Sequence, residues 1–373
     1  MKPRVLWVTP LALVLIALAS VCVAHDGPYV IRAPDGSWRA LNVDAEPGGL
    51  RRRDTPLGAD PVVTVNAVGD QPAFRVPLRV ATAAREELKV PVRSPLFVVA
   101  DTHGEYEILA RQLREHAVVD ATLSWSFGRG HLVVLGDVFD RGPRQTEILW
   151  LLYKLEAEAA KAGGGAHLVL GNHEAMVLRG DLRYLHDRYL DTARTLGARS
   201  YSQLFGEQAL LGQWLRARPT LLRINDQLFL HGGVSRVLAD SGLSLSEINT
   251  QVRSWLSARD AANEDELKRA ELLLGGLGPL WYRGYFDVPS FPKASEEDVD
   301  RALTVFGAQR MFIGHTVVPT VTPLYGGKVI AVQVYPKIEA DGETRFESLL
   351  IRNGVLWRAL PGGVTRKLEP GAD

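Results

Sequence analysis

The chain has 373 residues, with 43 basic and 43 acidic side chains and therefore no formal net charge. Apolar residues make up 46% and aromatic residues 8%, an ordinary globular balance that excludes a disordered, collagen-like or coiled-coil chain. A neutral chain also lacks the basic surface that would neutralise nucleic-acid phosphates, so we expect no nucleic-acid partner.

Residues 1–24 have the features of a signal peptide. Two basic residues precede an apolar run over residues 5–23, and Cys22 and Ala24 are small residues placed as at a signal-peptidase site. We expect cleavage after Ala24 and a periplasmic or secreted mature protein. The alternative is an uncleaved anchor, because a run of about 19 residues is just long enough to span a bilayer, and membrane attachment is expected only in that case.

Cys22 is the only cysteine in the sequence. An intrachain disulfide and a thiolate metal cluster are therefore excluded. Cleavage would remove Cys22 and the two basic residues before the apolar run, which leaves 41 basic and 43 acidic side chains and a net charge of −2. We therefore expect a cysteine-free mature protein with no disulfide partner.

Residues 25–94 predict a β-rich extension. Four short apolar or alternating runs predict strands: 29–31, 38–41, 62–68 and 74–80. A Pro34-Asp35-Gly36 turn signal joins the first two runs and predicts a hairpin. The stretch 44–61 is rich in proline, glycine and charge and includes three consecutive arginines, so we expect a solvated loop there.

From about residue 95 the pattern changes to that of an α/β domain. Five short runs rich in valine, leucine and isoleucine predict buried strands: 96–100, 132–135, 168–170, 228–230 and 311–313. Helical spacing predicts helices at 105–118 and 144–162, the second of which ends at three consecutive glycines. The segment 175–222 predicts a packed helical subdomain, with a lid over the sheet as the alternative.

Beyond residue 245 the sequence predicts one more helix, at 246–274, and then a return to strands. The expected strands are 328–335, 345–351 and 354–359. An Asn353-Gly354 turn joins the last two. We therefore expect one large domain over 95–360 and a short C-terminal tail over 361–373.

Each of the five buried runs is followed by polar residues that can bind metal, most of them flanked by glycine. The segments are Asp101-Thr102-His103-Gly104, Gly136-Asp137-Val138-Phe139-Asp140-Arg141-Gly142, Gly171-Asn172-His173-Glu174, His231-Gly232-Gly233 and Gly314-His315-Thr316. Ligands bind at the carboxyl ends of strands in an open α/β sheet, so five such ends predict one site. Glycine allows the sharp turns and close backbone approach that the site needs.

The expected ligand atoms are oxygen and imidazole nitrogen, without sulfur. This donor set suits manganese, iron or zinc. A carboxylate can bridge two metals, and Asp137 is the central candidate. Two neighbouring metals can hold both ends of an in-line phosphoryl displacement. Arg141 lies beside the ligands and offers a planar donor fork for phosphate oxygens.

The motifs resemble those of the phosphoprotein phosphatase family of calcineurin-like metallophosphoesterases. The family's elements Asp-x-His-Gly, Gly-Asp-x-x-Asp-Arg-Gly, Gly-Asn-His-Glu, His-Gly-Gly and a later histidine occur in order over residues 97–316. The segment Trp281-Tyr282-Arg283-Gly284-Tyr285 and the signal peptide are similar to the Shewanella-like phosphatase branch of bacteria and plants. The resemblance implies an α/β fold, a four-layer αββα sandwich with a central β-sandwich and helices on the outer faces.

For the cofactors, the resemblance implies two divalent metal ions. Ligand chemistry favours manganese, with iron or zinc as alternatives. Asp101 and His103 would bind the first ion, and Asp137 would bridge both. Three further side chains would complete the second ion: Asn172, His231 and His315.

For catalysis, the resemblance implies that His173 protonates the leaving oxygen and that Asp140 orients it. A histidine held by a carboxylate is a good general acid, because the pair tunes its pKa and its geometry. Arg141 and Arg283 would clamp the phosphoryl group, and Asn172 would also contact it. A hydroxide that bridges the metals would attack phosphorus in line, without a phosphoenzyme intermediate.

Four nearby residues are interpreted differently. We expect Glu174 to hold its turn through hydrogen bonds rather than to act as a base. Trp281 and Tyr282 could stack on an aromatic substrate ring or pack in the core, and both interpretations stay open. Tyr335 ends the segment 332–335, which does not match the C-terminal tyrosine loop of the eukaryotic family members, so we do not expect regulation by their subunits.

The resemblance therefore implies a phosphatase that hydrolyses phosphomonoesters. The expected substrate is a phosphorylated protein, with phosphotyrosine slightly favoured over phosphoserine and phosphothreonine, or a small phosphomonoester. The depth of the cleft, which the loops at 175–222 and 281–296 set, would decide between them. The alternatives are a dinucleoside polyphosphate hydrolase and a catalytically silent binding protein of the same fold.

Overall fold

The computed structural model describes residues 23–80, 83–257, 263–338, 340, 342 and 344–369. The expected signal peptide therefore lies outside the described residues except for its last two positions. Within these ranges, every helix is too short or too polar to cross a bilayer.

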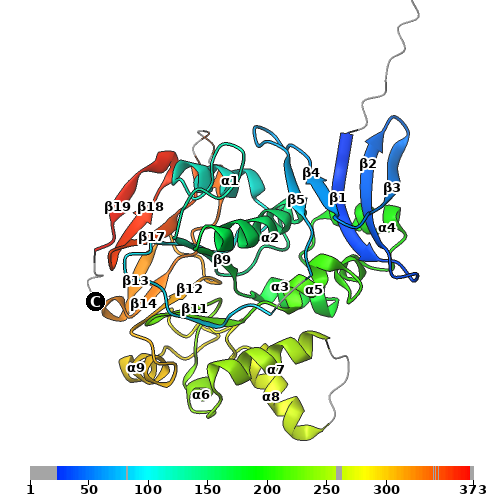
Figure 1. Ribbon diagram of the computed structural model, residues 1–373. Coiled ribbons are helices and arrows are strands. Elements are labelled where there is room, and N and C mark those ends of the chain that lie inside the picture. The colour runs from blue at the N-terminus through cyan, green and yellow to red at the C-terminus, as the bar shows by residue number, and fades with distance from the viewer. Residues whose placement is uncertain are drawn as a thin grey trace, which may run out of the picture.

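Two six-stranded sheets form the centre of the molecule (Figure 1). The first contains, in spatial order, β13 (Thr322–Leu324), β14 (Val329–Ala331), β12 (Arg310–Ile313), β11 (Gln227–Leu230), β10 (Leu221–Ile224) and β6 (Glu87–Leu88). The second contains β19 (Thr365–Lys367), β18 (Val355–Ala359), β17 (Ser348–Arg352), β7 (Leu96–Val99), β8 (His131–Val134) and β9 (Gly165–Leu168). Strands β7, β8 and β9 run parallel, and every residue of β7 and β8 is buried, as expected for strands covered on both faces.

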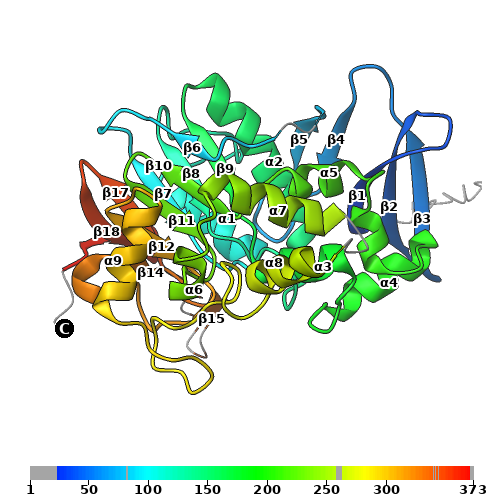
Figure 2. The ribbon, with the colours of Figure 1, turned by 90° about the horizontal axis from the view of Figure 1, so that it is seen from below.

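Helices cover the outer faces of the two sheets (Figures 1 and 2). The helices of the described residues are α1 (Tyr106–Glu115), α2 (Gln145–Lys161), α3 (Asn172–Arg179), α4 (Asp187–Leu196), α5 (Leu210–Arg216), α6 (Arg236–Ala239), α7 (Leu245–Ser257), α8 (Glu264–Leu274) and α9 (Glu296–Val305), of which α4 packs on the N-terminal sheet instead. Helices α1 and α2 lie on the side of the second sheet, and α6, α7 and α9 lie on the side of the first. The predicted αββα sandwich is therefore confirmed.

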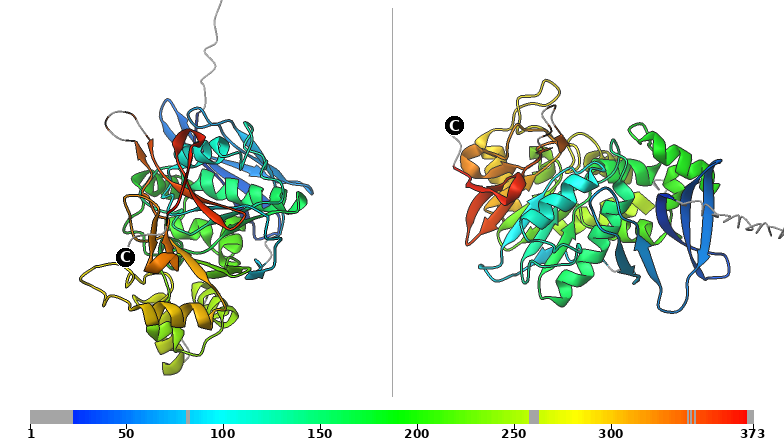
Figure 3. Two further views of the ribbon diagram at one scale, coloured as in Figure 1. Left: turned by 90° about the vertical axis from the view of Figure 1, so that its left-hand side faces the viewer. Right: turned by 90° about the horizontal axis from the view of Figure 1, so that it is seen from above.

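The N-terminal extension forms a separate three-stranded antiparallel sheet. It consists of β1 (Val23–Arg32), β2 (Trp38–Glu46) and β3 (Gly49–Pro56), and Tyr29 pairs with Leu41 across the predicted hairpin. A second hairpin, β4 (Val62–Val65) and β5 (Phe74–Pro77), confirms the other two predicted strands. The three-stranded sheet packs beside α4 and α5, at the end of the molecule opposite β17–β19 (Figure 3).

The expectation of a loop over 44–61 is wrong, because β3 occupies residues 49–56 of that stretch and pairs with β2 along its whole length. The three arginines are compatible with a strand because carboxylates on the same hairpin pair with their charges. The nitrogen–oxygen distances are 2.9 Å for Arg51 with Glu46, 3.0 Å for Arg52 with Asp54 and 2.7 Å for Arg53 with Asp44. Sequence composition alone does not show this pairing.

Three further parts of the chain differ from expectation. The strand expected at 168–170 is β9, at residues 165–168, which begins at the third of the consecutive glycines. A Cβ atom on Gly164 would lie 2.3 Å from the carbonyl oxygen of Gly130, so glycine lets the chain enter the sheet there. The helix expected at 246–274 is two helices, α7 and α8. Near the C-terminus, β19 adds a strand to the second sheet by pairing with β18.

Candidate active site

The predicted site residues gather at the carboxyl ends of five strands. Asp101 and His103 follow β7, Asp137, Asp140 and Arg141 follow β8, Asn172 and His173 follow β9, His231 follows β11, and His315 follows β12. All six predicted metal ligands are at most 5% exposed. The fold therefore brings together, inside the protein, residues that lie up to 214 positions apart in the sequence.

The loops that carry these side chains have a left-handed backbone at non-glycine residues. The φ angles are 42° at Asp101, 42° at His103, 54° at Asp137, 70° at Asp140, 66° at Arg141 and 63° at His315. Such conformations cost of the order of 1–3 kcal/mol each and persist only where the surrounding structure fixes them. Their concentration in these loops marks the region as one shaped for function.

Two glycines let the carboxylates approach the neighbouring loops. A Cβ atom on Gly171 would lie 2.2 Å from Oδ1 of Asp137, and one on Gly314 would lie 2.4 Å from Oδ1 of Asp101. Any larger residue would displace the carboxylate that it faces. The glycine flanks of the motifs thus have a steric reason in this site.

One group of donor atoms contains His103, Asp137 and His173. The Nε2 atoms of both histidines lie 3.8 Å from Oδ2 of Asp137. Nδ1 of His103 lies 2.9 Å from the carbonyl oxygen of Phe139. Because a carbonyl only accepts, Nδ1 carries the proton, and the lone pair of Nε2 is directed elsewhere.

A second group contains Asp137, His231 and His315, and it shares Asp137 with the first. Nε2 of His231 lies 3.1 Å from Oδ2 of Asp137 and 2.9 Å from Oδ1 of Asn172. Nδ1 of His231 donates to the carbonyl oxygen of Leu135 over 2.6 Å. Asp137 thus stands between the two groups, as a bridging carboxylate would.

Asp101 lies beside the second group. Its carboxylate accepts a hydrogen bond from the backbone N–H of His315, at 3.1 and 3.2 Å to the two oxygens. Oδ1 of Asp101 also lies 4.0 Å from Nδ1 of His231. Asp101 belongs to neither donor group, and these two contacts place it beside His231 and His315.

The electrostatics of the cluster favour a bound cation. Burial raises the pKa of Asp101 to about 7. Burial alone would also raise the pKa of Asp137, but His231 and His173 hold it well below its usual range. Burial alone would lower the pKa of His231, yet Asp137 and Asp101 raise it to about 9. The buried carboxylates therefore stabilise positive charge between them.

Two imidazole nitrogens are directed into the cluster without a protein partner. Nε2 of His103 and Nε2 of His315 are buried and form no hydrogen bond with any described residue. Burial lowers the pKa of His103 to about 4, and burial together with His231 holds the pKa of His315 well below its usual value. Both rings are therefore neutral and carry free lone pairs, which is what a divalent metal ion requires of histidine.

Glu174 holds the loop backbone and is not directed at the cluster. One oxygen accepts from the N–H groups of Asp137 and Gly171, at 2.8 and 2.7 Å, and the other accepts from that of Val138 at 2.8 Å. The carboxylate is fully buried and lies near the N-terminus of α3, where a negative charge is stabilised. The expected structural role of Glu174 is confirmed.

His173 and Asp140 form a buried pair at the edge of the cluster. Nδ1 of His173 lies 2.6 Å from Oδ2 of Asp140. Burial alone would lower the pKa of His173, but Asp137 and the hydrogen bond to Asp140 raise it above its ordinary value. The pair therefore favours a protonated imidazole, in contrast to the neutral ring of His103.

The two predicted clamp arginines lie within electrostatic reach of the cluster. Burial lowers the pKa of Arg283, and Asp101 and Asp137 oppose that shift, whereas Arg141 adds to it. The guanidinium carbon of Arg141 lies 5.8 Å from the ring centroid of Tyr335, a cation–π distance. Arg141 is exposed, so its guanidinium is accessible from solvent.

Three aromatic rings surround the histidines. The ring centroid of Tyr335 lies 5.9 Å from that of His103, the ring of Tyr184 lies 5.4 Å from that of His173, and the ring of Trp281 lies 5.6 Å from that of His315. Trp281 and Tyr335 are half-buried and Tyr184 is exposed, so each presents surface toward solvent.

Tyr184 and Tyr335 lie at the site although no sequence motif indicates it. Tyr184 lies in a loop without a motif, and only the tertiary fold brings it to His173. Tyr335 ends a segment that does not match the family's tyrosine loop, yet its ring lies beside His103. For Tyr282 the core-packing interpretation holds, since it is 5% exposed and packs on Tyr285 and Phe291.

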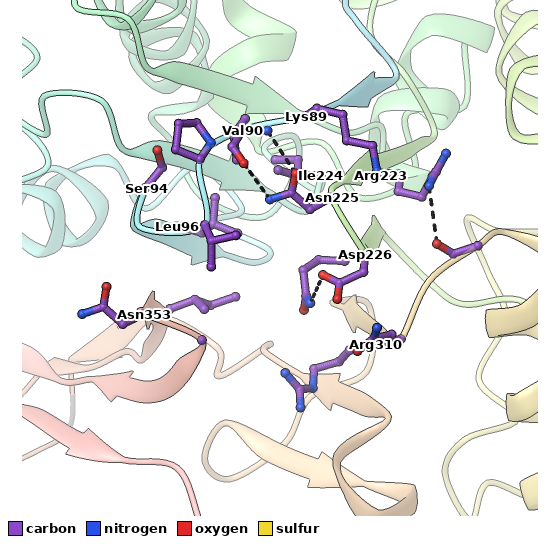
Figure 4. Close-up of a pocket in the computed structure, with 17 residues that line it drawn as sticks. Lys89, Val90, Ser94, Leu96, Arg223, Ile224, Asn225, Asp226, Arg310 and Asn353 are labelled. Atoms are coloured by element: carbon purple, nitrogen blue, oxygen red, sulfur yellow. Dashed lines mark hydrogen bonds between the residues drawn. The ribbon is translucent and has the colours of Figure 1, made fainter.

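A cavity of about 560 Å³ lies at the other ends of the strands, and its lining includes Lys89, Leu96, Arg310 and Asn353 (Figure 4). Leu96 and Arg310 are the first residues of β7 and β12, whereas the predicted ligands follow the last residues of those strands. This cavity is therefore separate from the candidate active site.

Two histidine-containing donor groups share one carboxylate, and they lie at the strand ends of an αββα sandwich. This is the arrangement of a metallophosphoesterase. Residues 94–319 match the family model of the calcineurin-like phosphoesterases, and the chain belongs to this family. The family acts through divalent metal ions, in agreement with the donor groups described above.

The comparisons also confirm the predicted branch. The chain is 27% identical over 272 residues to Shewanella-like protein phosphatase 2 of Arabidopsis thaliana, covering 60% of this chain and 66% of that protein. It is 27% identical over 230 residues to Shewanella-like protein phosphatase 1 of Plasmodium berghei, covering 60% of this chain and 62% of that protein. The chain thus spans slightly less than two thirds of the length of these relatives.

Among solved structures, the chain is similar to a cold-active protein-tyrosine phosphatase of a psychrophilic Shewanella species. The TM-score is 0.79 and the identity is 33%, over 92% of this chain and 99% of that one. A match of this extent includes most of the N-terminal extension, which the family model does not reach.

Proposed function

We propose that this protein is a dinuclear metal-dependent phosphatase that hydrolyses phosphomonoesters. The observation that carries the proposal is the position of Asp137, which is shared by two buried donor groups and lies 3.8 Å from the His173 ring of the buried His173–Asp140 pair. This arrangement provides two metal positions and a proton donor within one cluster.

His103, Asp137 and Asp101 would hold one ion, and Asp137, Asn172, His231 and His315 would hold the other. His173 lies as near to Asp137 as His103 does, but Nδ1 of His173 is held by the carboxylate of Asp140 at 2.6 Å, whereas Nδ1 of His103 is held by a backbone carbonyl and its Nε2 has no hydrogen-bond partner among the described residues. We therefore assign His173 to proton donation and His103 to metal binding. Manganese is the proposed metal, with iron and zinc as alternatives that fit the same oxygen and imidazole donors.

When bound, the two ions would supply a hydroxide nucleophile at neutral pH and neutralise charge on the phosphoryl group. The residues of the chain perform the remaining work. Arg141 and Arg283 would hold the phosphoryl oxygens, and Asn172, whose Oδ1 lies 2.9 Å from Nε2 of His231, would also contact them. His173 gives its Nε2 proton to the leaving oxygen, and Asp140 keeps the ring oriented and stabilises its charge until then.

We propose phosphotyrosine as the preferred substrate. The rings of Tyr184, Trp281 and Tyr335 lie within 6 Å of the cluster's histidines, and they can pack on a substrate phenyl ring in edge-to-face or offset geometry. Phosphoserine has no ring to fill such a space. The similar Shewanella enzyme, which is described as a protein-tyrosine phosphatase, supports the same choice.

The decisive experiment is an assay of protein reconstituted with manganese, iron or zinc. Phosphotyrosine, phosphoserine and phosphothreonine peptides and a dinucleoside polyphosphate would be compared at equal concentration. We expect the highest kcat/KM on phosphotyrosine. Preferential cleavage of the dinucleoside polyphosphate would replace the proposal with an anhydride hydrolase, and lack of turnover on every substrate with metals bound would indicate a silent binding protein.

We further propose that residues 1–24 direct the protein to the periplasm or out of the cell and are then removed. The proposal rests on the sequence of that segment alone. N-terminal sequencing of protein purified from a secreting host tests it. A mature chain that begins at His25 is expected, and a membrane-bound chain with an intact N-terminus would instead identify an anchor.

A further inference from the structure

A line of hydrogen bonds joins the N-terminal sheet to the His173–Asp140 pair. The backbone N–H of Asp140 donates to Oε1 of Gln145 over 2.7 Å, and Nε2 of Gln145 donates to the hydroxyl of Tyr201 over 2.8 Å. The hydroxyl oxygens of Tyr201 and Tyr29 lie 3.2 Å apart, and the hydroxyl of Tyr29 donates to Oδ2 of Asp26 over 2.7 Å. Tyr29 and Asp26 belong to β1, so the line starts outside the family domain.

The line has one consistent direction. The hydroxyl of Tyr29 has a single proton, and the carboxylate of Asp26 accepts it at the shortest distance. The oxygen of Tyr29 can then accept from Tyr201, whose own oxygen accepts from Gln145. Each group donates toward Asp26, and such aligned hydrogen bonds polarise and strengthen one another in a buried region.

Burial keeps the line intact. Asp140 and Gln145 are fully buried, Tyr201 is 1% exposed, Tyr29 is 2% exposed and Asp26 is 4% exposed. Water therefore cannot replace a lost partner without entering the core, and an unsatisfied buried group costs about 1–3 kcal/mol. The rings of Tyr29, Tyr201 and Phe205 also contact one another edge to face, which fixes the positions of the hydroxyls.

The backbone of Asp140 needs this support. Its φ angle is 70°, a conformation that a non-glycine residue adopts only when its surroundings impose it. The Oδ1 atom of Asp140 has no hydrogen-bond partner among the described residues, so the carboxylate is oriented by His173 on one side and by the backbone on the other. Gln145 holds that backbone through the N–H.

We propose that Gln145, Tyr201 and Tyr29 are positioning residues, through which the N-terminal sheet holds Asp140, and thereby the His173 general acid, in its productive geometry. Among the described residues, none of the three has a hydrogen bond with a residue of the two donor groups. The inference rests on the proposed function only in so far as His173 acts as the general acid. It gives the extension a role in catalysis in addition to its packing against α4 and α5.

The first experiment uses the leaving-group dependence of turnover. A general acid matters most when the leaving oxygen is a poor leaving group, so phenyl phosphate would be compared with 4-nitrophenyl phosphate. In Gln145→Met, Tyr201→Phe and Tyr29→Phe we expect kcat on phenyl phosphate to fall roughly ten-fold, against at most two- to three-fold on 4-nitrophenyl phosphate. Removal of the whole proton donor would lower kcat further, by about 10²–10⁴-fold.

Tyr153→Phe is the matched control. Tyr153 is a fully buried tyrosine whose hydroxyl is bonded to the backbone N–H and carbonyl of Arg79, both at 2.7 Å, so it also ties the extension to α2. Its hydroxyl is not part of the line to Asp140. We expect Tyr153→Phe to lower the melting temperature as the line variants do, while the ratio of the two kcat values stays at the wild-type value.

A second measurement does not depend on activity. Hydrogen exchange of the backbone N–H of Asp140 should be slow in the wild type and in Tyr153→Phe, and at least ten-fold faster in Gln145→Met and Tyr201→Phe. If the protein hydrolyses no phosphomonoester, the proposed function fails while the exchange result still tests the positioning of Asp140. Equal loss of kcat on both substrates, or unchanged exchange at Asp140 in the line variants, overturns the inference.

Discussion

His173 Nδ1 lies 2.6 Å from Asp140 Oδ2, and neither side chain is more than 4% exposed. The short distance and the burial make this a charge-assisted hydrogen bond, which fixes the tautomer of the imidazole and directs Nε2 toward Asp137. A proton held at Nε2 in this position is available to a leaving oxygen bound beside the donor groups.

Replacement of His173 tests this arrangement. We expect His173→Asn to lower kcat by roughly two orders of magnitude or more, because a general acid contributes about 10²–10⁴-fold. Metal content, measured by mass spectrometry, should stay at the wild-type value, since His173 is not a proposed ligand. Asp140→Asn should lower kcat as well, and the double variant should be little worse than His173→Asn because the two residues act as one unit. Loss of one metal from His173→Asn would instead assign His173 to metal binding.

Glu174→Gln should weaken metal binding even though Glu174 is not a proposed metal ligand. The carboxylate accepts from the N–H groups of Asp137, Val138 and Gly171, and an amide offers only one acceptor oxygen in their place. We expect metal affinity to fall about 10–100-fold, as for other residues that orient ligands, and the free energy of unfolding to fall by about 1–3 kcal/mol.

Glu158→Gln is a suitable control for Glu174→Gln. Glu158 also accepts from a backbone N–H, that of Trp125 at 2.9 Å, but it lies on α2 away from the donor groups. Glu158→Gln should lower the free energy of unfolding modestly and leave the metal affinity unchanged. Equal metal affinities in the wild type and Glu174→Gln, measured by competition with a chromophoric chelator, would refute the orienting role.

The aromatic residues around the site should set substrate preference. Trp281→Ala and Tyr184→Ala remove rings that lie 5.6 Å from His315 and 5.4 Å from His173. An aromatic pair contributes about 0.5–1.5 kcal/mol beyond its buried area, so kcat/KM on a phosphotyrosine peptide should fall roughly two- to ten-fold per ring. On the matching phosphoserine peptide we expect a change below two-fold. Parallel losses on both peptides would show that the rings only support the fold.

The catalytic centre could be predicted from the sequence because each of its ligands lies one to a few residues beyond a buried strand. Asp101 directly follows an apolar run, and Asp137 and His315 are each separated from one by a single glycine. Parallel strand ends meet at one edge of a sheet. The division of the ligands between the two ions rests on the resemblance and not on any local pattern. The backbone angles of the loop that carries Asp101 decide which side chains it approaches, and no local pattern encodes them.

Features that depend on pairing between distant segments could not be predicted. Tyr29 and Tyr201 are 172 residues apart, and nothing local to either residue indicates that their hydroxyls meet. The strand at 49–56 has the composition of a loop, and the carboxylates that neutralise its arginines become visible only when it pairs with β2. Tyr184 and Tyr335 reach the site from loops whose course the tertiary fold decides.

A histidine pair outside the active site should make the stability of the protein depend on pH. His131 begins β8 and His167 lies on β9, with stacked rings whose centroids are 5.3 Å apart and with Nδ1 of His131 3.0 Å from Nε2 of His167. Burial lowers the pKa of His131, and burial together with His131 lowers the pKa of His167 to about 3. The unfolded chain, with an ordinary value of 6.5, therefore binds more protons than the native state between pH 6.5 and about 3.

The stabilisation that comes from the neutral pair is complete above pH 6.5 and is lost as the pH falls below it, by up to about 1.4 kcal/mol per pH unit for each proton. Urea unfolding of chelator-treated protein at pH 7.5, 6.0 and 5.0 measures the slope, and His167→Gln should reduce it. His186→Gln, which alters the histidine that caps α4, serves as the control and should retain the wild-type slope. If His167→Gln loses stability with falling pH as steeply as the wild type does, other titratable groups cause the loss of stability at acid pH.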